Sequence, residues 1–199
     1  MAYPEVGSPY GMIPINLIGG QVFAGSTRLI PIATNSSTAI YFGDVVKLAN
    51  TGTLARDAGT DAATPVGVFL GCSYTDATFG KTFRQYYPGT TNVTDVVAYV
   101  ADDPSLLFKV AVVSTGTTIS YATRANVGEN AVLVQNSGST ANGDSRNAIS
   151  STTATTSTWP LRIVDVVKET ALATNSASYT EVIVKWNAGM HQYDNPAGI

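Results

Sequence analysis

The sequence predicts a mostly β protein: an antiparallel sandwich or barrel, jelly-roll-like, with an extended N-terminal arm and little helix. Short runs of β-branched and aromatic residues are bounded by Gly, Asn, Asp and Thr, which is typical of strands and turns. No window of about 11 residues repeats its apolar positions at helical spacing. Many short strands without intervening helices indicate an antiparallel sandwich or barrel.

The first 27 residues are predicted to form the arm, and residues 28–199 the β body. Pro4, Pro9 and Pro14 lie among several glycines, a pattern that disfavours both helix and strand. The segment is nevertheless rich in apolar residues, whereas disordered segments are poor in them. We therefore expect the arm to dock on a protein surface.

Nine candidate strands follow in the body. The clearest is the last, in which Val182, Val184 and Trp186 alternate with mostly polar residues, so that one face is apolar. The candidates are 28–33, 39–42, 45–48, 66–72, 96–100, 107–113, 131–135, 161–167 and 181–187.

Two other segments are predicted to lack strands. Asp103 followed by Pro104 is a helix-start signal, and a turn or two of helix at most is expected after it. Residues 136–158 are almost entirely Ser, Thr, Asn, Ala and Gly, so a long exposed loop or hairpin is expected there. A loop of that length is uncommon in a compact domain, so it is expected to be either mobile or ordered by a neighbouring subunit.

The composition of the chain indicates which binding partners and which cellular compartment to expect. The net charge of −3 comes from 14 acidic and 11 basic residues without a Lys/Arg cluster, so neither nucleic acid nor an anionic membrane is the expected partner. Cys72 is the single cysteine, so no disulfide forms within the chain. The apolar stretch 12–18 is interrupted by Pro14 and Asn16, and we expect neither a signal peptide nor a membrane span. The chain is expected to mature in a cytoplasm.

No enzyme, cofactor or metal site is predicted. His191 is the single histidine, and the sequence contains no nucleophile motif to accompany it, so an exposed C-terminal histidine is expected. A β-barrel hydrolase would rest on His191 and Asp194 alone. Asp103 is interpreted as a helix cap, and residues 56–61 as a solvated loop, because they lack the ligand spacing of a calcium loop.

Four motifs resemble the decoration (cement) proteins of tailed-bacteriophage capsids and related virion structural proteins. Phe42-Gly-Asp-Val-Val-Lys-Leu48 and Thr64-Pro-Val-Gly-Val-Phe-Leu-Gly71 resemble a strand that follows a Gly-Asp turn and a later strand that begins with Pro-Val-Gly-Val. The segments 17–27 and 182–189 resemble such proteins too. The resemblance spans residues 17–189.

This resemblance implies a cement protein that binds the outer surface of a phage head and stabilises contacts between major capsid protein subunits. The expected form is a homo-oligomer, a trimer, assembled in the host cytoplasm and located on the virion. The resemblance assigns no contact residues. From the apolar residues of the arm, we expect four side chains to bury in the capsid or in a sister subunit: Tyr10, Ile13, Ile15 and Leu17.

The alternative is a head fibre, spike or carbohydrate-binding module that contacts the host surface. Ten tyrosines, including Tyr86 and Tyr87, could supply aromatic platforms for sugar rings. Core and interface roles are the more common use of tyrosine in a β protein.

Overall fold

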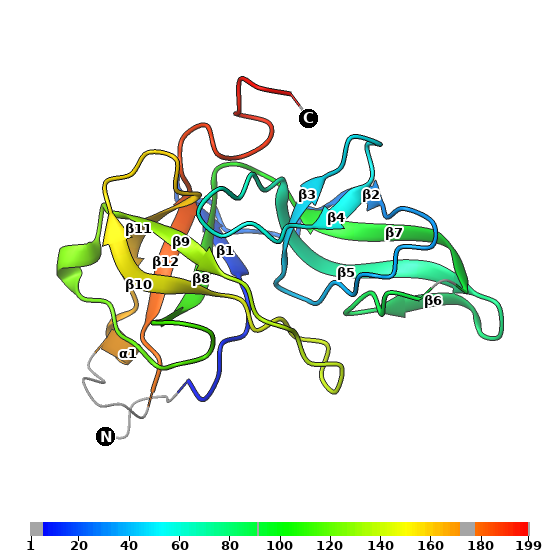
Figure 1. Cartoon of the computed structure of the whole chain (residues 1–199), viewed down its shortest axis with the longest axis horizontal. Coiled ribbons are helices and arrows are strands. Elements are labelled where there is room, and N and C mark those ends of the chain that lie inside the picture. The colour runs from blue at the N-terminus through cyan, green and yellow to red at the C-terminus, as the bar shows by residue number, and fades with distance from the viewer. Residues whose placement is uncertain (1–5, 91, 172–177, 199) are drawn as a thin grey trace.

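Two β lobes lie side by side along the long axis of the molecule (Figure 1). The computed structural model describes residues 6–90, 92–171 and 178–198. Strands dominate both lobes, and the helices in this part of the chain are a 3-10 turn, Arg124–Asn126, and a short α1, Lys168–Ala171. The predicted mostly β class with little helix is therefore confirmed.

The barrel lobe is a closed ring of five strands with a sixth strand paired to its side. Its strands are β1 (Ile13–Leu17), β8 (Leu106–Val113), β9 (Asn130–Val134), β10 (Ala148–Ala154), β11 (Leu161–Val166) and β12 (Glu181–Trp186). The order β8-β10-β9-β11-β12 closes because β12 pairs with β8. All pairs are antiparallel except β8 with β10. Closure leaves no free edge on the ring. Of the two predicted architectures, sandwich and barrel, this lobe is therefore a barrel.

The sheet lobe is built from the strands that precede the barrel. They are β2 (Arg28–Pro31), β3 (Val45–Leu48), β4 (Leu54–Arg56), β5 (Gly67–Asp76), β6 (Gly80–Arg84) and β7 (Val93–Ala101). Their order is β2-β7-β5-β3-β4. Strands β3 and β6 pair with the same edge of β5: β3 with its first residues and β6 with residues 72–76. A single bridge between Ile32 and Leu54 links the two ends of this order.

Each lobe has its own apolar core. In the barrel, Trp186 packs on Phe108 with ring centroids 5.1 Å apart. In the sheet lobe, Phe69, Tyr87 and Ile40 are fully buried. The barrel core also takes in residues from three strands of the sheet lobe, so the lobes are packed together: Val45, Val68 and Ala101.

The described part of the N-terminal segment packs on the chain's own barrel. Val6 exchanges hydrogen bonds with the segment before β12, from Tyr179 N to Val6 O and from Val6 N to Ser178 Oγ. Residues 13–17 form β1, although the prolines were expected to exclude a strand. Pro14 is tolerated because β1 lies outside the ring and its register shifts between Pro14 and Asn16. The expected docking is therefore at least partly intramolecular.

Met12, just before β1, ties this segment to the barrel core. Its side chain is fully buried. We expect Met12→Ala to lower the free energy of unfolding by about 2–4 kcal/mol through loss of buried volume. Urea denaturation followed by circular dichroism measures it. Ile18→Ala, at a side chain 52% exposed, should change stability by less than about 0.5 kcal/mol; equal effects would contradict the packing role of Met12.

The expectation of a loop over residues 136–158 is wrong in its second half, because Ala148–Ala154 form β10 in the middle of the barrel order. Ala148 and Ile149 are fully buried, and the rest of the strand is Ser, Thr and Ala. Backbone pairing on both sides, with β8 and β9, stabilises a strand that has little apolar patterning. Only the first half is a loop between β9 and β10.

Eight of the nine predicted strands are present, whereas 39–42 contains only isolated bridges at Ile40 and Phe42. The short strands β4 and β6 were not predicted. The helix signal at Asp103 marks a turn instead. Asp103 Oδ1 accepts a hydrogen bond from Ser105 N at 2.7 Å, and its carbonyl accepts one from Leu106 N, so a turn connects β7 directly to β8.

Candidate functional site

His191 is fully buried, which corrects the expectation of an exposed histidine. It lies in the segment after β12, between the rings of Trp186 and Tyr193. Nδ1 accepts a hydrogen bond from Tyr193 N at 3.2 Å, whereas Nε2 has no partner of good geometry, although backbone groups of Val66 and Asp102 lie near the ring. Burial lowers the pKa of His191, and these backbone groups and the Asp194 and Asp102 carboxylates oppose the shift. The arrangement is that of a packed neutral imidazole.

This burial makes stability depend on pH. Because the folded-state pKa lies below the ordinary value of about 6.5, the unfolded chain binds the proton more readily, and stability falls as pH drops below about 6.5. The loss reaches up to about 1.4 kcal/mol per pH unit until the folded-state pKa is passed. His191→Gln should flatten this slope in urea denaturation between pH 7 and 5.5. An unchanged slope in the variant would contradict this role for His191.

Two further residues with reactive side chains, Cys72 and Asp57, are also buried. Burial raises the pKa of the Cys72 thiol to about 12, partly offset by Arg84, so the thiol stays protonated at neutral pH. Asp57, expected in a solvated loop, is buried and accepts a hydrogen bond from Gly59 N.

In the part of the chain that the structure describes, no three His, Cys, Asp or Glu residues gather as metal ligands. No helix within these residues has the length and apolarity to cross a membrane.

A buried polar cluster joins the two lobes, and we call it the Asp44 cluster: Asp44, Arg56, Ser145 and Asn147. Asp44 Oδ1 accepts hydrogen bonds from Ser145 Oγ at 2.6 Å and Asn147 Nδ2 at 3.2 Å. Asp44 Oδ2 lies 3.2 Å from Arg56 Nε and accepts the backbone N–H of Tyr41. Burial raises the pKa of Asp44, and Arg56 with these hydrogen bonds opposes the shift. Asp44 and Arg56 belong to the sheet lobe, and the other two lie in the β9–β10 connection.

The backbone crosses closely beside this cluster. Gly11 has φ +83°, and a Cβ there would lie 2.7 Å from both the carbonyl oxygen of Gly43 and the Cβ of Ser145. Met12 N donates to Gly43 O, and Gly11 N donates to Asn147 O. The Gly-Asp turn of the first motif is therefore a structural junction in which the N-terminal segment, the sheet lobe and the β9–β10 connection meet.

The four predicted contact residues of the arm all lie half-buried on the barrel. The Tyr10 hydroxyl donates a hydrogen bond to Glu181, and Glu181 also forms an ion pair with Lys109 at 3.1 Å. The pKa of Tyr10 is raised, mainly by burial and secondly by the neighbouring Glu181 carboxylate. Leu17 packs against the barrel core. Ile13 and Ile15 lie on β1 near them. The surface that remains on these side chains is what a second protein could contact.

A second surface with exposed apolar side chains lies on the outer face of the sheet lobe. Two rows of residues cross this face from strand to strand. The first row runs from β2 through β7 to β5 and consists of Leu29, Tyr99 and Gly71. The second row continues to β6 and consists of Pro31, Val97, Ser73 and Phe83. Leu29 and Phe83 are 61% and 68% exposed. We call the residues of these two rows the outer sheet face.

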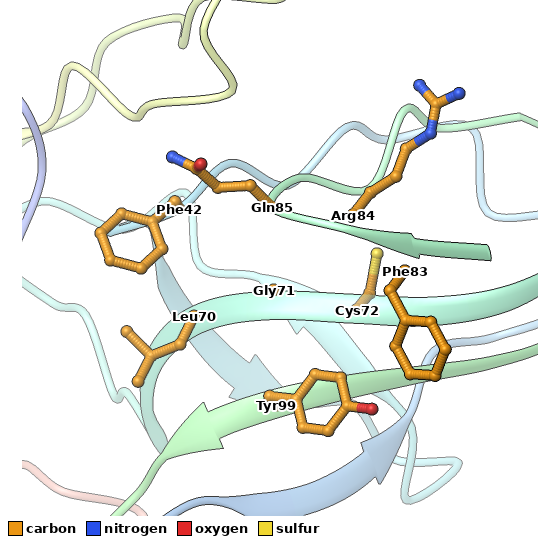
Figure 2. A pocket seen from close by; sticks show the side chains of 8 residues that line it. All are labelled: Phe42, Leu70, Gly71, Cys72, Phe83, Arg84, Gln85 and Tyr99. Carbon is orange, nitrogen blue, oxygen red and sulfur yellow. The ribbon is translucent and has the colours of Figure 1, made fainter. Parts of the chain in front are cut away.

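An open hollow adjoins this face, lined in part by Leu70, Phe83 and Tyr99. Figure 2 shows the Phe83 and Tyr99 rings on one side of β5 and the Cys72 thiol on the other. Single exposed apolar residues are common, but an apolar sheet face with two large exposed side chains is a typical protein contact surface.

The β5–β6 hairpin extends this surface to the end of the molecule that lies farthest from the barrel (Figure 1). Phe79 at its turn is 79% exposed, the highest value among the large exposed hydrophobic residues of the described chain. Lys81 and Arg84 are exposed on β6. Aromatic residues and arginine are the side chains most often found to dominate binding energies at interfaces.

The outer sheet face was not predicted from the sequence. The candidate strand 96–100 is apolar at every position, so its pattern did not show which face is covered. Residues 80–84, Gly-Lys-Thr-Phe-Arg, are too short and polar to indicate a strand. One signal was present: Gly80 follows the apolar run of β5 at hairpin distance, which is typical of a turn between paired strands.

The comparisons with known proteins gave no match: no protein-family model, no curated protein and no solved structure is similar to this chain.

Proposed function

We propose that this protein is a capsid decoration (cement) protein that binds the outer surface of a phage head as a homo-oligomer. The identity of the partner comes from the resemblance of the four sequence motifs. The structural observation that supports a binding role is the outer sheet face, which exposes Leu29 and Phe83 on a rigid sheet. A rigid surface loses little conformational freedom on binding, which favours affinity.

The mechanism is mechanical. Apolar contacts from the sheet lobe and from the half-buried side chains of the N-terminal segment would span adjacent major capsid protein subunits. Several copies held in one oligomer would multiply these weak contacts through high effective concentration. The Asp44 cluster and the barrel core would keep the two contact regions at a fixed separation. Separating the capsid subunits would then require breaking both contacts.

Co-sedimentation with decoration-free phage heads tests this function, with light scattering to measure the oligomeric state. We expect saturable binding by a trimer and a higher melting temperature of the decorated heads. The double variant Leu29→Ser/Phe83→Ser should bind at least about 30-fold more weakly, corresponding to about 2 kcal/mol at a binding hot spot. Tyr121→Ser, an exposed aromatic outside this face, is the matched control.

Two outcomes would count against the proposal. Wild-type protein that does not bind heads would exclude the cement function, and a glycan array would then test the alternative carbohydrate-binding role through the same exposed aromatic rings. Binding by the double variant equal to that of the control would exclude the outer sheet face as the contact surface.

A further inference from the structure

β6 is an edge strand whose outer side is open. It pairs with β5 from Gly80 to Arg84, and among the backbone hydrogen bonds of the described residues it makes none to any other segment. An open edge presents alternate N–H and C=O groups that can pair with another extended chain. The edge lies in the sheet lobe, at the end of the molecule away from the barrel (Figure 1).

The side chains of this edge are cationic and aromatic. Lys81 and Phe83 project to one face and Arg84 to the other, because residues alternate along a strand. Neither Lys81 nor Arg84 belongs to any of the five ion pairs found within the described residues. The protein as a whole carries a net charge of −3, so two unpaired cations on one five-residue strand form a local concentration of positive charge.

The nearby carboxylates are already engaged in local structure. Asp76 Oδ1 accepts the backbone N–H groups of Thr78 and Phe79 and holds the hairpin turn. Asp95 Oδ2 accepts the hydroxyls of Thr75 and Thr94 on the other side of β5. Neither Asp76 nor Asp95 forms an ion pair with Lys81 or Arg84 among the described residues, so both cations are available to a ligand from outside the lobe.

We infer that β6 binds an extended acidic segment of a partner protein, which adds to the sheet as a further strand. Carboxylates of the segment would pair with Lys81 and Arg84, and an apolar side chain between them would cover Phe83. A second copy of this chain is a poor occupant, because pairing β6 with β6 would bring four cations onto one ribbon without a carboxylate on either strand. That the segment belongs to the major capsid protein rests on the proposed function.

The probe is the eight-residue peptide Thr-Val-Glu-Val-Thr-Glu-Val-Thr, blocked at both ends. In an antiparallel register its two Glu side chains lie opposite Arg84 and Lys81, and the Val after the first Glu lies opposite Phe83. The reference probe has Lys in place of both Glu residues. We expect the acidic peptide to bind the full chain saturably below about 1 mM and at least about tenfold more tightly than the basic one. Amide hydrogen exchange should slow within residues 80–84, which is the specific sign of strand addition.

Charge reversal gives the matched comparison. Lys81→Glu/Arg84→Glu should reverse the peptide preference, whereas Arg146→Glu/Lys168→Glu, at exposed cations of the barrel lobe, should retain it. Three results would overturn the inference: no binding of the acidic peptide up to about 1 mM, binding without protection of residues 80–84, or binding of phosphatidylserine vesicles in its place.

Measuring the binding of both proteins to decoration-free phage heads distinguishes a failure of this inference from a failure of the proposed function. If wild-type protein and Lys81→Glu/Arg84→Glu bind heads equally, the acidic partner is wrong while the cement function stands. If the wild-type protein binds the acidic peptide but no heads, strand addition stands and the capsid identification is wrong.

Discussion

Replacing Asp44 by alanine is expected to lower the free energy of unfolding by about 3–5 kcal/mol. The carboxylate is fully buried and is the centre of the Asp44 cluster. Its loss would leave the Arg56 guanidinium without its counter-ion and would remove the acceptor for Ser145, Asn147 and the backbone of Tyr41. Buried polar groups without partners cost far more than the net gain of the bonds that they replace.

Urea denaturation followed by circular dichroism measures this effect. Asp61→Ala, at an exposed carboxylate of the same lobe, should change stability by less than about 0.5 kcal/mol. Ser145→Ala removes one hydrogen bond and should cost about 1–2 kcal/mol. An Asp44→Ala effect no larger than that of Ser145→Ala would mean that water enters the cluster and solvates Arg56.

The effect on the relation between the lobes is separately measurable. Because Asp44 and Arg56 lie in the sheet lobe, whereas Ser145 and Asn147 lie in the β9–β10 connection, the variant should exchange amide hydrogens faster in residues 143–147 than in the barrel strands. Equal acceleration throughout the protein would instead indicate purely global destabilisation.

Strong patterns in the sequence identified most of the fold. Strand β12 was predicted because its apolar and polar residues alternate. Strand β8 was predicted because Phe108, Val110 and Val112 alternate with residues that form a second, partly apolar face. The strand β10 was missed because only Ala148 and Ile149 fill its apolar positions, while the β8 residues with which it pairs lie 37 positions earlier in the chain. Such pairing is a tertiary property, and no local composition reveals it.

The same reasoning explains the errors at the chemically interesting residues. His191 looks like part of a polar C-terminal tail, yet Gln192 N donates to Pro65 O and Tyr193 lies against Arg28, so the segment is fastened to the sheet lobe and the imidazole is covered. Asp44 was recognised only as part of a turn, because its partners lie about 100 residues away. The hairpin carrying Phe79 and Phe83 could be expected from turn chemistry, but the exposure of its aromatic side chains could not.

The second large effect is expected at Trp186, the largest fully enclosed side chain of the barrel. It lies on β12, which pairs with β11 on one side and with β8 on the other and so closes the ring. Trp186→Ala would leave a cavity beside Phe108 and His191 and is expected to lower the free energy of unfolding by about 3–5 kcal/mol.

The variant Trp186→Phe shows whether the stability lost on removing Trp186 comes from its buried volume or from a hydrogen bond of its indole N–H. Trp186 Nε1 is buried without a hydrogen-bond partner, so the phenylalanine variant loses volume but no hydrogen bond, and it should cost only about 1–2 kcal/mol. Chemical denaturation followed by circular dichroism compares the two variants, with Tyr121→Ala as an exposed aromatic control. If Trp186→Phe proved as costly as Trp186→Ala, then Nε1 would have a partner such as a buried water, and the barrel would depend on that hydrogen bond as well as on packing.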